Sequence, residues 1–494
     1  MSEATSQVRY LGFVFSTSEC GVAAIRADGR EAYASTPIEG RVTWQGWPAH
    51  YLEHTPEMMV RVLDRLEAKG FPLDRKGTMS ASWRQHDLAV LDDQDAPLAP
   101  APSWQCNGAT EETRTLNQDI AGFAESVGTI EPRFVAAKLP WMLGRIPKMR
   151  RHVHRALLSG DWLAGKLTGS YRLSASDAIC NGLLDQRTKA LATDALKRAG
   201  RKLGKRLDPA WFPEVIASDG IVGRVRTSSD PRFAALSKRL RGWKVAAALG
   251  DNQATAAGCG AADHGTIVIS LGTSGTVNRV VPMDAPLRGR AACFEYWDDR
   301  LLLMMLPACA SWYEIFRATY ATDLPHDTLN ERALRARLAG TKLMSPPPDR
   351  AITRGTHRWK ALEGMKPSER IASVQLSIAA EMLARVRAML REVKGRGEPV
   401  RRFILTGGLA QAPLIEQALV LGLDAMAPGA SIEQSRRRGP LAFKTDALGA
   451  LYNARMSDTR ETLAGIAARE SKTKRCRMPD TRRASAIRAA LGID

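Results

Sequence analysis

The sequence lacks three features that would each direct its interpretation elsewhere. It has no apolar run of transmembrane length, and its first residues, MSEATSQVRYLGFVF, place an acid before a base without a signal-peptide pattern. Its 7 cysteines are scattered, odd in number and free of CxxC spacing, which argues against a disulfide framework or a zinc site. We therefore expect a cytoplasmic protein without a membrane segment.

Acidic residues are also in short supply, 52 against 71 Lys and Arg, so the formal net charge is +19. Such a charge suits either nucleic-acid binding or an Arg-rich solvated surface. The basic residues are dispersed and rarely alternate with aromatic residues, which favours the surface interpretation. Nucleic-acid binding stays open as an alternative, and it predicts an affinity that falls steeply with salt.

A chain of 494 residues is too long for one ordinary core, so two large domains are the default expectation. Strand-like runs alternate with helical periodicity, which predicts an α/β protein. We expect strands at 9–16, 21–25, 78–83, 88–91, 243–245, 266–271 and 402–406. We expect helices at 56–69, 138–168, 187–207, at 369–394 with Ser368 as N-cap and Gly395 as stop, from 413, and near the C-terminus.

The most informative stretch is 246–277, AAALGDNQATAAGCGAADHGTIVISLGTSGTV. Asp251 precedes a run of small residues and could accept a proton from a hydroxyl; a helix N-cap would suit the same position. The strand at 266–271 ends in Gly272-Thr273-Ser274-Gly275, whose backbone N–H groups and hydroxyls suit an anion. Together these features predict phosphoryl transfer to an alcohol, although a plain turn is the simpler interpretation of the second.

Two further segments resemble nucleotide-binding loops. The strand at 402–406 runs into Gly407-Gly408-Leu409-Ala410, where glycine lets a backbone approach a ligand closely. Residues 160–167, GDWLAGKL, nearly spell a nucleotide-binding P-loop. They lack the hydroxyl residue after Lys166 and a preceding strand, so we interpret them as a chance match.

The pairing of Gly250-Asp251-Asn252 with Gly272-Thr273-Ser274-Gly275 resembles the FGGY carbohydrate kinases, and the resemblance extends over about 9–455. It implies two ribonuclease-H-like α/β domains, as in the actin and sugar kinase superfamily, with a catalytic cleft between them. It also implies ATP and Mg²⁺ as cofactors, with the metal-holding residues unknown. The implied domains are 1–241 on the sugar side, 242–458 on the nucleotide side, and a basic tail over 459–494.

The resemblance assigns residue roles. Asp251 would be the general base, and Gln85, His86, Trp104, Asp251 and Asn252 would contact the sugar. The nucleotide would be held by Ser16, Thr17, Gly272, Thr273, Ser274, Gly407, Gly408 and Ala410. The segment Ser82-Trp83-Arg84-Gln85-His86 is similar to the sugar-reading segment of xylulose kinases, which implies a pentulose as acceptor. The family also implies that a homodimer is compatible with this chain.

The sequence departs from the family pattern at four places. Val14 stands where the first phosphate loop carries an Asp, and Cys106 stands where an Asp contacts substrate hydroxyls. Trp83 and Leu409 each replace a glycine. These departures keep a second hypothesis open, a degenerate kinase that binds nucleotide or sugar with little phosphotransfer. The nearby carboxylate of Asp87 is a candidate to compensate for the acid lost at Val14.

Overall fold

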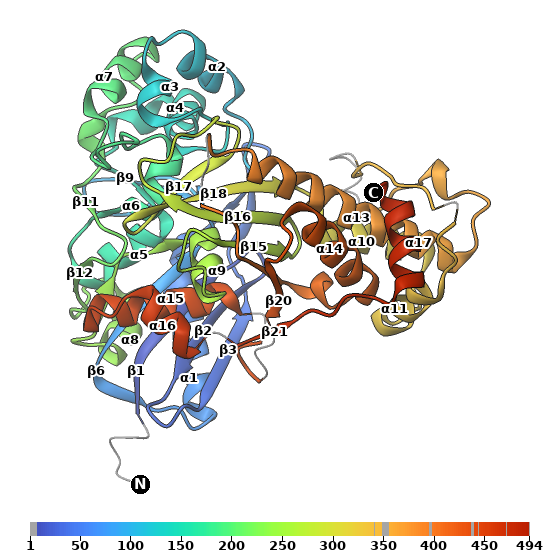
Figure 1. Ribbon diagram of the computed structural model, residues 1–494. Coiled ribbons are helices and arrows are strands. Elements are labelled where there is room, and N and C mark those ends of the chain that lie inside the picture. Colours follow the sequence, from blue (N-terminus) through green and yellow to red (C-terminus); the bar gives the residue numbers. More distant parts are fainter. Residues whose placement is uncertain are drawn as a thin grey trace. The chain divides into compact units, whose positions relative to one another are not determined.

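The computed structural model describes residues 7–339, 341–347, 355–394, 398–435, 439–442, 444–470 and 472–493. The chain divides into two compact units (Figure 1). Unit 1 comprises Met1–Gly260, Cys293–Leu301 and Arg438–Glu470, and unit 2 comprises Ala261–Ala292, Leu302–Arg437 and Ser471–Asp494. No helix among the described residues is long and apolar enough to cross a membrane.

Unit 1 is built on a seven-stranded sheet in the order β12-β13-β6-β1-β2-β3, with β14 also paired to β6. The strands are β1 (Val8–Phe15), β2 (Glu19–Ile25), β3 (Glu31–Pro37), β6 (Leu73–Trp83), β12 (Ile221–Arg224), β13 (Lys244–Ala246) and β14 (Leu249–Gly250). β1, β13 and β14 run parallel to β6, whereas β1, β2 and β3 form an antiparallel meander. The strands predicted at 9–16, 21–25, 78–83 and 243–245 are confirmed.

Five helices accompany this sheet: α1 (Thr55–Ala68), α5 (Ser159–Thr168), α8 (Pro231–Arg239), α9 (Asp251–Gly258) and α15 (Thr445–Thr459). Glycines let α15 lie unusually close to its neighbours. A Cβ on Gly12 of β1 would stand 2.1 Å from the carbonyl O of Ala447, and one on Gly449 would stand 1.9 Å from that of Ala254. These contacts fix α9, which begins at Asp251, against β1 and α15.

A second core of unit 1 lies among its smaller helices and short strands. The elements outside the main sheet are β4 (Arg41–Trp44), β5 (Trp47–His50), β7 (Leu88–Leu91), β8 (Ala101–Pro102), α2 (Thr110–Gln118), α3 (Phe123–Val127), α4 (Val135–Arg145), β9 (Arg155–Leu158), β10 (Leu173–Ser174), α6 (Ala175–Ala178), α7 (Thr193–Lys202), β11 (Val215–Ile216) and α16 (Leu463–Glu470).

The single helix predicted over 138–168 is wrong. The structure has α4, a 3-10 turn at Pro147–Arg151, strand β9 and then α5. Pro147 removes a helical hydrogen-bond donor, and β9 instead pairs antiparallel with β7. The basic helix predicted over 187–207 is shorter than expected, because only α7 within that span is helical.

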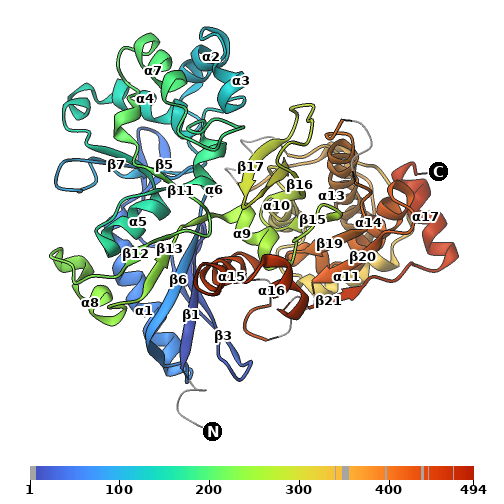
Figure 2. The ribbon, with the colours of Figure 1, turned by 60° about the vertical axis from the view of Figure 1, so that its left-hand side comes forward.

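A second seven-stranded sheet has the order β17-β18-β16-β15-β19-β20-β21. The strands β15 (Thr266–Leu271), β16 (Gly275–Pro282), β19 (Arg402–Thr406), β20 (Ser431–Ser435) and β21 (Thr473–Arg475) belong to unit 2, whereas most of β17 (Ala292–Tyr296) and the start of β18 (Asp299–Leu306) belong to the 293–301 segment of unit 1. The helices of unit 2 are α10 (Ala310–Tyr320), α11 (His326–Arg335), α13 (Pro367–Leu390), α14 (Pro413–Met426) and α17 (Thr481–Leu491). The predicted strands β15 and β19 are confirmed and run parallel to each other, and α13 packs against α14 (Figure 2).

Two details of the predicted helix over 369–394 differ. α13 begins earlier, with Lys366 rather than Ser368 as its N-cap, and the backbone N–H of Lys366 donates to the carboxylate of Glu369 (3.1 Å). The helix ends at Leu390. The predicted stop at Gly395 lies outside the described residues.

The compact units differ from the predicted domains 1–241, 242–458 and 459–494, which stay a prediction. β13 and β14 pair with β6, so 244–250 lies within unit 1. The predicted basic tail contains more structure than its composition indicates: β21 pairs antiparallel with β20, and Ile466 and Ile487 are buried.

Candidate active site

The polar residues predicted in unit 1 follow three strands that end at the same edge of its sheet. Phe15, the last residue of β1, and Gly250, the last of β14, both pair with Trp83, the last of β6. Ser16, the segment from Arg84 to His86, and Asp251 therefore share one edge. In parallel sheets this edge is where ligands are usually bound.

Asp251 is the first residue of α9, and the N-cap position belongs to Gly250, so the simpler role as helix N-cap does not apply to Asp251. Its carboxylate accepts from the backbone N–H groups of Gln85 and Asn252, which lowers its pKa. Burial and the charge of Asp446 outweigh these bonds and raise the pKa to about 7. A carboxylate with this pKa suits a general base near neutral pH.

A chain of amide groups holds the residues around Asp251. Asn252 donates from Nδ2 to Oδ1 of Asp251 (3.2 Å) and to Oε1 of Gln85 (2.7 Å). Gln85 donates from Nε2 to Oε1 of Gln253 (2.5 Å), and Gln253 donates to the carbonyl O of Ser176 (2.5 Å). Sequence reasoning missed Gln253, for which the polar side chain two residues after Asp251 was the signal.

His86, predicted to contact the sugar, is buried at 6% exposure with a left-handed φ of 71°. Its Nδ1 lies 3.0 Å from Oδ1 of Asn181, and its ring stacks on Phe134. Burial keeps the pKa of His86 well below its ordinary value, so the ring is neutral at physiological pH. A sugar contact by His86 stays a prediction.

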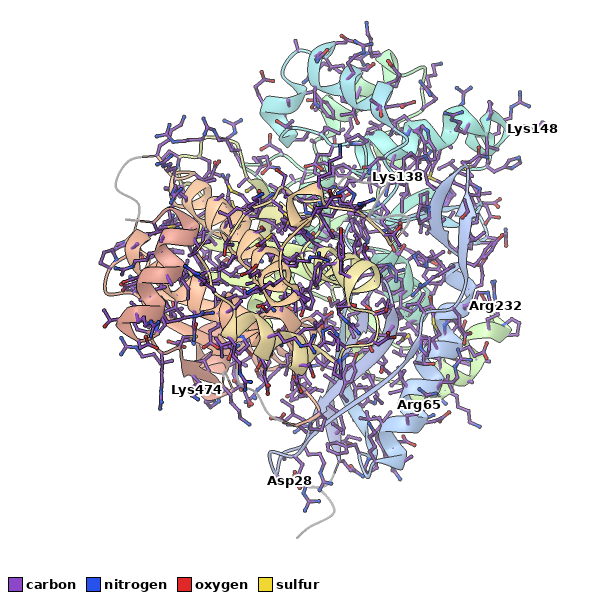
Figure 3. The ribbon with its side chains drawn as sticks, turned by 90° about the vertical axis from the view of Figure 1, so that its right-hand side faces the viewer. Asp28, Arg65, Lys138, Lys148, Arg232 and Lys474 are labelled. Carbon is purple, nitrogen blue, oxygen red and sulfur yellow. The ribbon has the colours of Figure 1, made fainter. Side chains whose placement is uncertain are left out.

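Lys138 of α4 is fully buried, whereas Lys148, in the 3-10 turn that follows α4, is exposed (Figure 3). Its Nζ donates to the carbonyl oxygens of His86 (2.6 Å), Ser103 (2.9 Å) and Pro102 (3.3 Å). Burial lowers the pKa of Lys138 to about 8. Lys138 thus joins the turn that carries His86 to the strand that precedes Trp104.

Trp104 lies beside the first predicted phosphate loop, and its Nε1 donates to Oγ1 of Thr17 at 3.4 Å. Trp104 is half-buried and Thr17 is exposed. The nearby Cys106 is fully buried, and burial raises the pKa of its thiol. Cys106 therefore offers no charged acceptor to a sugar.

A buried ion pair occupies the turn next to Ser16. Arg84 donates from Nη1 to the carbonyl O of Ser16 (2.6 Å) and from Nε to Oδ2 of Asp87 (2.7 Å). Asp87 is fully buried, and its second oxygen, Oδ1, has no hydrogen-bond partner. Trp83 donates to the paired oxygen at 3.4 Å and stacks on Phe15, with ring centroids 3.9 Å apart.

The residues at this edge do not by themselves form a metal site. Among the described residues, no group of three or more His, Cys, Asp or Glu could hold a metal ion. Val14 is 2% exposed and has no ligating atom, and Asp87 is already paired with Arg84. The residues present therefore do not fit a protein-only Mg²⁺ site.

Unit 2 brings its two glycine loops together at one edge of its own sheet. β15 and β19 are parallel neighbours, with Ser270 opposite Thr406, so the loops that follow them share that edge. Gly407 has a φ of 93°, and a Cβ there would stand 2.6 Å from the carbonyl C of Leu271. Glycine is required at this position, both for its φ and for the close approach.

The loop at 272–275, which follows β15, also contacts the start of α10. The backbone N–H groups of Cys309 and Ala310 donate to the carbonyl oxygens of Thr273 (3.0 Å) and Gly272 (2.8 Å). Ser311 donates from Oγ to the same Thr273 carbonyl (3.0 Å), a contact that sequence reasoning missed. Thr273 itself is exposed and Ser274 is half-buried.

The loop at 407–410, which follows β19, forms a turn although Leu409 stands where the family pattern has a glycine. Gly408 is exposed, whereas Leu409 and Ala410 are buried. Gln434 of β20 donates to the carbonyl O of Ala410. The segment 160–167 lies within α5 and follows strand β9 directly, so the expected absence of a preceding strand is wrong. The segment is helical rather than a loop, and Lys166 pairs with Asp230 at 3.2 Å; its interpretation as a chance match stays a prediction.

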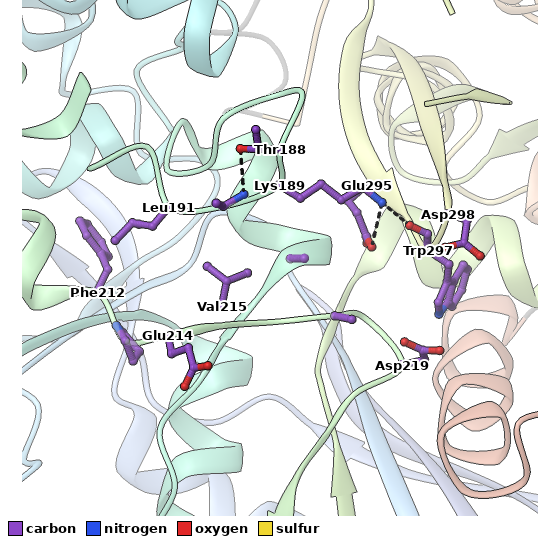
Figure 4. Close-up of a pocket in the computed structure, with 14 residues that line it drawn as sticks. Thr188, Lys189, Leu191, Phe212, Glu214, Val215, Asp219, Glu295, Trp297 and Asp298 are labelled. Carbon is purple, nitrogen blue, oxygen red and sulfur yellow. Dashed lines mark hydrogen bonds and ion pairs between the residues drawn. The ribbon is translucent and has the colours of Figure 1, made fainter. Parts of the chain in front are cut away.

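A pocket of about 620 Å³ in unit 1 is lined by residues other than the predicted site residues (Figure 4). Its polar wall is largely paired internally: Lys189 contacts Glu295 at 3.9 Å and donates to the carbonyl O of Trp297, and Ser218 donates to Glu295. Burial raises the pKa of Glu295 to about 7. None of the residues predicted from the sequence lines this pocket.

Parts of this chain are similar in sequence to known proteins. Residues 18–258 match the N-terminal domain of the FGGY family of carbohydrate kinases. A xylulose kinase of Streptomyces rubiginosus is 32% identical over 206 residues, which cover 41% of this chain and 40% of that protein. The chain thus spans about two fifths of the length of this curated relative.

Solved structures share the fold over the whole length. The ligand-bound xylulose kinase from Lactobacillus acidophilus has a TM-score of 0.80 at 15% identity, over 99% of this chain and 96% of that one. The glycerol kinase of Plasmodium falciparum with ADP has a TM-score of 0.77 at 14% identity, over 100% and 98%. These matches show that the mixed α/β fold is shared with solved sugar kinases, and that residues 18–258 are similar to the N-terminal domain of the FGGY carbohydrate kinases.

Proposed function

We propose that this protein is an ATP-dependent carbohydrate kinase, similar to xylulose kinase, that transfers the γ-phosphate of ATP to a sugar hydroxyl. The observation that supports the proposal most directly is the carboxylate of Asp251, which follows the strand ends at one edge of the unit 1 sheet and has a pKa of about 7. A sugar hydroxyl is a poor nucleophile until a base accepts its proton. Asp251 is the group at this edge with that capacity.

The amide chain around Asp251 supports its role. Asn252 and Gln85 bond to each other and hold the carboxylate from one side, so its orientation does not depend on the substrate. Pre-organised groups of this kind avoid rearrangement during the reaction. In the proposal, Gln85, His86, Trp104 and Asn252 shape the sugar site, and Asp251 takes the proton of the reacting hydroxyl.

The nucleotide side of the proposal rests on unit 2. Gly272, Thr273 and Ser274 would receive phosphates, and Gly407, Gly408 and Ala410 would receive the adenosine, since the two loops share one sheet edge. The proposal keeps Ser16 and Thr17 as phosphate contacts on the strength of the resemblance alone. Mg²⁺ would come with the nucleotide, whose phosphates supply many of its ligands in such enzymes. A pentulose acceptor, a cytoplasmic location and a homodimer belong to the same proposal.

A coupled ADP-release assay tests this function. Purified protein with Mg-ATP would be given pentuloses, pentitols, glycerol and heptuloses in turn. We expect turnover with a pentulose, and a loss of roughly 10²–10⁴-fold in Asp251→Asn, the size of a general-base contribution. Asp194→Asn, in the exposed first turn of α7, is the matched control and should keep full activity.

Two results would contradict the proposal. Unchanged turnover in Asp251→Asn would show that Asp251 is not the general base. Absence of turnover with every sugar, together with ATP binding by calorimetry, would favour the degenerate kinase instead.

A further inference from the structure

A hollow of about 630 Å³ in unit 1 is lined almost entirely by cationic side chains. Its lining consists of Arg75, Lys76, Arg224, Lys238, Arg239, Arg241 and Gly242. These residues come from the first half of β6, the end of β12, and the end of α8 with the turn after it (Figure 2). Segments far apart in the sequence thus bring six positive charges to one concave surface.

Little of this charge is neutralised within the protein. Arg239 pairs with Asp64 and, at 2.7 Å, with Glu67, and Arg224 donates to the carbonyl O of Gly242 at 3.0 Å. In the part of the chain that the structure describes, no acidic side chain forms an ion pair with the other four, Arg75, Lys76, Lys238 and Arg241. Like charges held close together repel one another, so the folded hollow favours an anion.

Helix stabilisation accounts for only part of the cluster. Lys238 and Arg239 lie in the last turn of α8, where positive charge interacts favourably with the helix dipole. Arg75, Lys76 and Arg224 belong to strands, and Arg241 belongs to a turn. No helix dipole explains those four residues.

The hollow is distinct from the candidate active site. Lys76 lies near the start of β6 and Gln85 follows its end, which at about 3.3 Å per strand residue separates them by roughly 30 Å. The hollow therefore lies toward the opposite edge of the sheet from Asp251. Its role does not depend on the proposed kinase function.

We propose that this hollow binds a small molecule carrying several phosphate groups. Arginine guanidinium groups bind phosphate through paired N–H donors, and the volume falls within the ordinary range for small-molecule sites. Nucleic acid fits less well, because a single-stranded chain is usually bound along a track of charges with aromatic stacking partners. None of the described residues that line this hollow is aromatic.

Calorimetric titration of the full-length protein with inositol hexakisphosphate tests the site, with neutral myo-inositol as the matched ligand. The triple variant Arg75→Gln/Lys76→Gln/Arg241→Gln removes three unpaired charges. Lys197→Gln/Arg198→Gln/Arg201→Gln removes the same charge from the exposed face of α7. Circular dichroism confirms that each variant is folded, and Arg241→Glu provides a single-site reversal with little demand on folding.

We expect the hollow triple variant to weaken binding at least tenfold, Arg241→Glu to weaken it severalfold, and the α7 triple variant to change it less than about twofold. The slope of log Kd against log salt should also become shallower only in the hollow variants. Kinase turnover without the probe should stay unchanged in all of them. Equal weakening by both triple variants would overturn the proposal in favour of a diffuse charged surface. Tighter binding of a 12-nucleotide single strand than of the probe, lost in the hollow variants, would overturn it in favour of nucleic acid.

Discussion

Two neighbouring turns of unit 1 treat a buried carboxylate in opposite ways. At the start of α9, Asp251 is held by amide and backbone donors, and its pKa of about 7 lets it exchange a proton near neutral pH. After β6, Asp87 is committed to Arg84 at 2.7 Å and is sealed from solvent beneath Trp83. The first arrangement suits chemistry and the second suits fixed structure.

This contrast bears on the expected departures from the family pattern. Where the resemblance implies an acid in the first phosphate loop, this chain has the buried Val14, and the adjacent turn holds an internal ion pair. The expectation that Asp87 compensates for the missing acid receives no support from its surroundings, since Arg84 already neutralises it. The comparison therefore separates the proposed base, Asp251, from a turn whose charged pair is buried and neutralised internally.

The largest effect should come from breaking the buried pair. Arg84→Met leaves Asp87 as a buried carboxylate without a counter-charge, and we expect a loss of about 3–5 kcal/mol in the free energy of unfolding. Urea denaturation measures this loss. The double variant Arg84→Met/Asp87→Leu removes both charges and should recover most of it.

An exposed pair provides the matched control for that measurement. Arg114 contacts Asp119 at 3.1 Å with its side chain 49% exposed, so Arg114→Met should cost no more than about 1 kcal/mol. A loss below about 1 kcal/mol in Arg84→Met as well would show that Asp87 is not confined by Arg84. The distinction between the two turns would then fail.

A smaller effect is expected from restoring the acid to the first loop. Val14 is 2% exposed and lies between Gly21 and Ser82 of the adjacent strands. We expect Val14→Asp to lose about 2–3 kcal/mol of stability, without a gain in turnover. Because burial raises the pKa of a carboxyl group, this loss should shrink as pH falls.

Val14→Asn separates charge from shape in this test, since it brings polarity to the site without a titratable group. Its stability loss should not depend on pH. A tenfold or larger rise in turnover by Val14→Asp, at undiminished stability, would instead mark the first loop as a decayed catalytic element. The two turns would then differ by evolutionary loss rather than by assigned role.

Sequence reasoning identified the strand ends of both sheets because glycines and polar residues interrupt apolar runs there. It placed Asp251 and the loop at Gly272 on the correct elements for that reason. It did not find the ion pair of Arg84 with Asp87, because two charged residues three apart in a loop look the same whether solvated or buried. The strand β9 was hidden for a similar reason, since RALL pairs with β7 through contacts that no local pattern records.

The basic tail shows the same limit. Composition alone gave 459–494 little reason to fold, yet β21 completes a sheet edge by pairing with β20. The strand β21 forms by pairing with β20, which is not adjacent to it in the sequence. Long-range pairing of this kind is what local propensity cannot supply.

The smallest expected effect concerns the pKa of Asp251 and its influence on the pH dependence of kcat/KM. A general base must be deprotonated, so kcat/KM should fall about tenfold per pH unit below a pKa of about 7. The charge of Asp446 is the largest cause of that raised pKa after burial. Asp446→Asn should therefore lower the pKa of Asp251 and move the acid limb of the profile to lower pH, while Asp194→Asn leaves it in place.

An acid limb that stays where it is in Asp446→Asn would mean that burial alone sets the pKa of the base. The position of α15 against α9 would then matter for packing but not for the proton transfer.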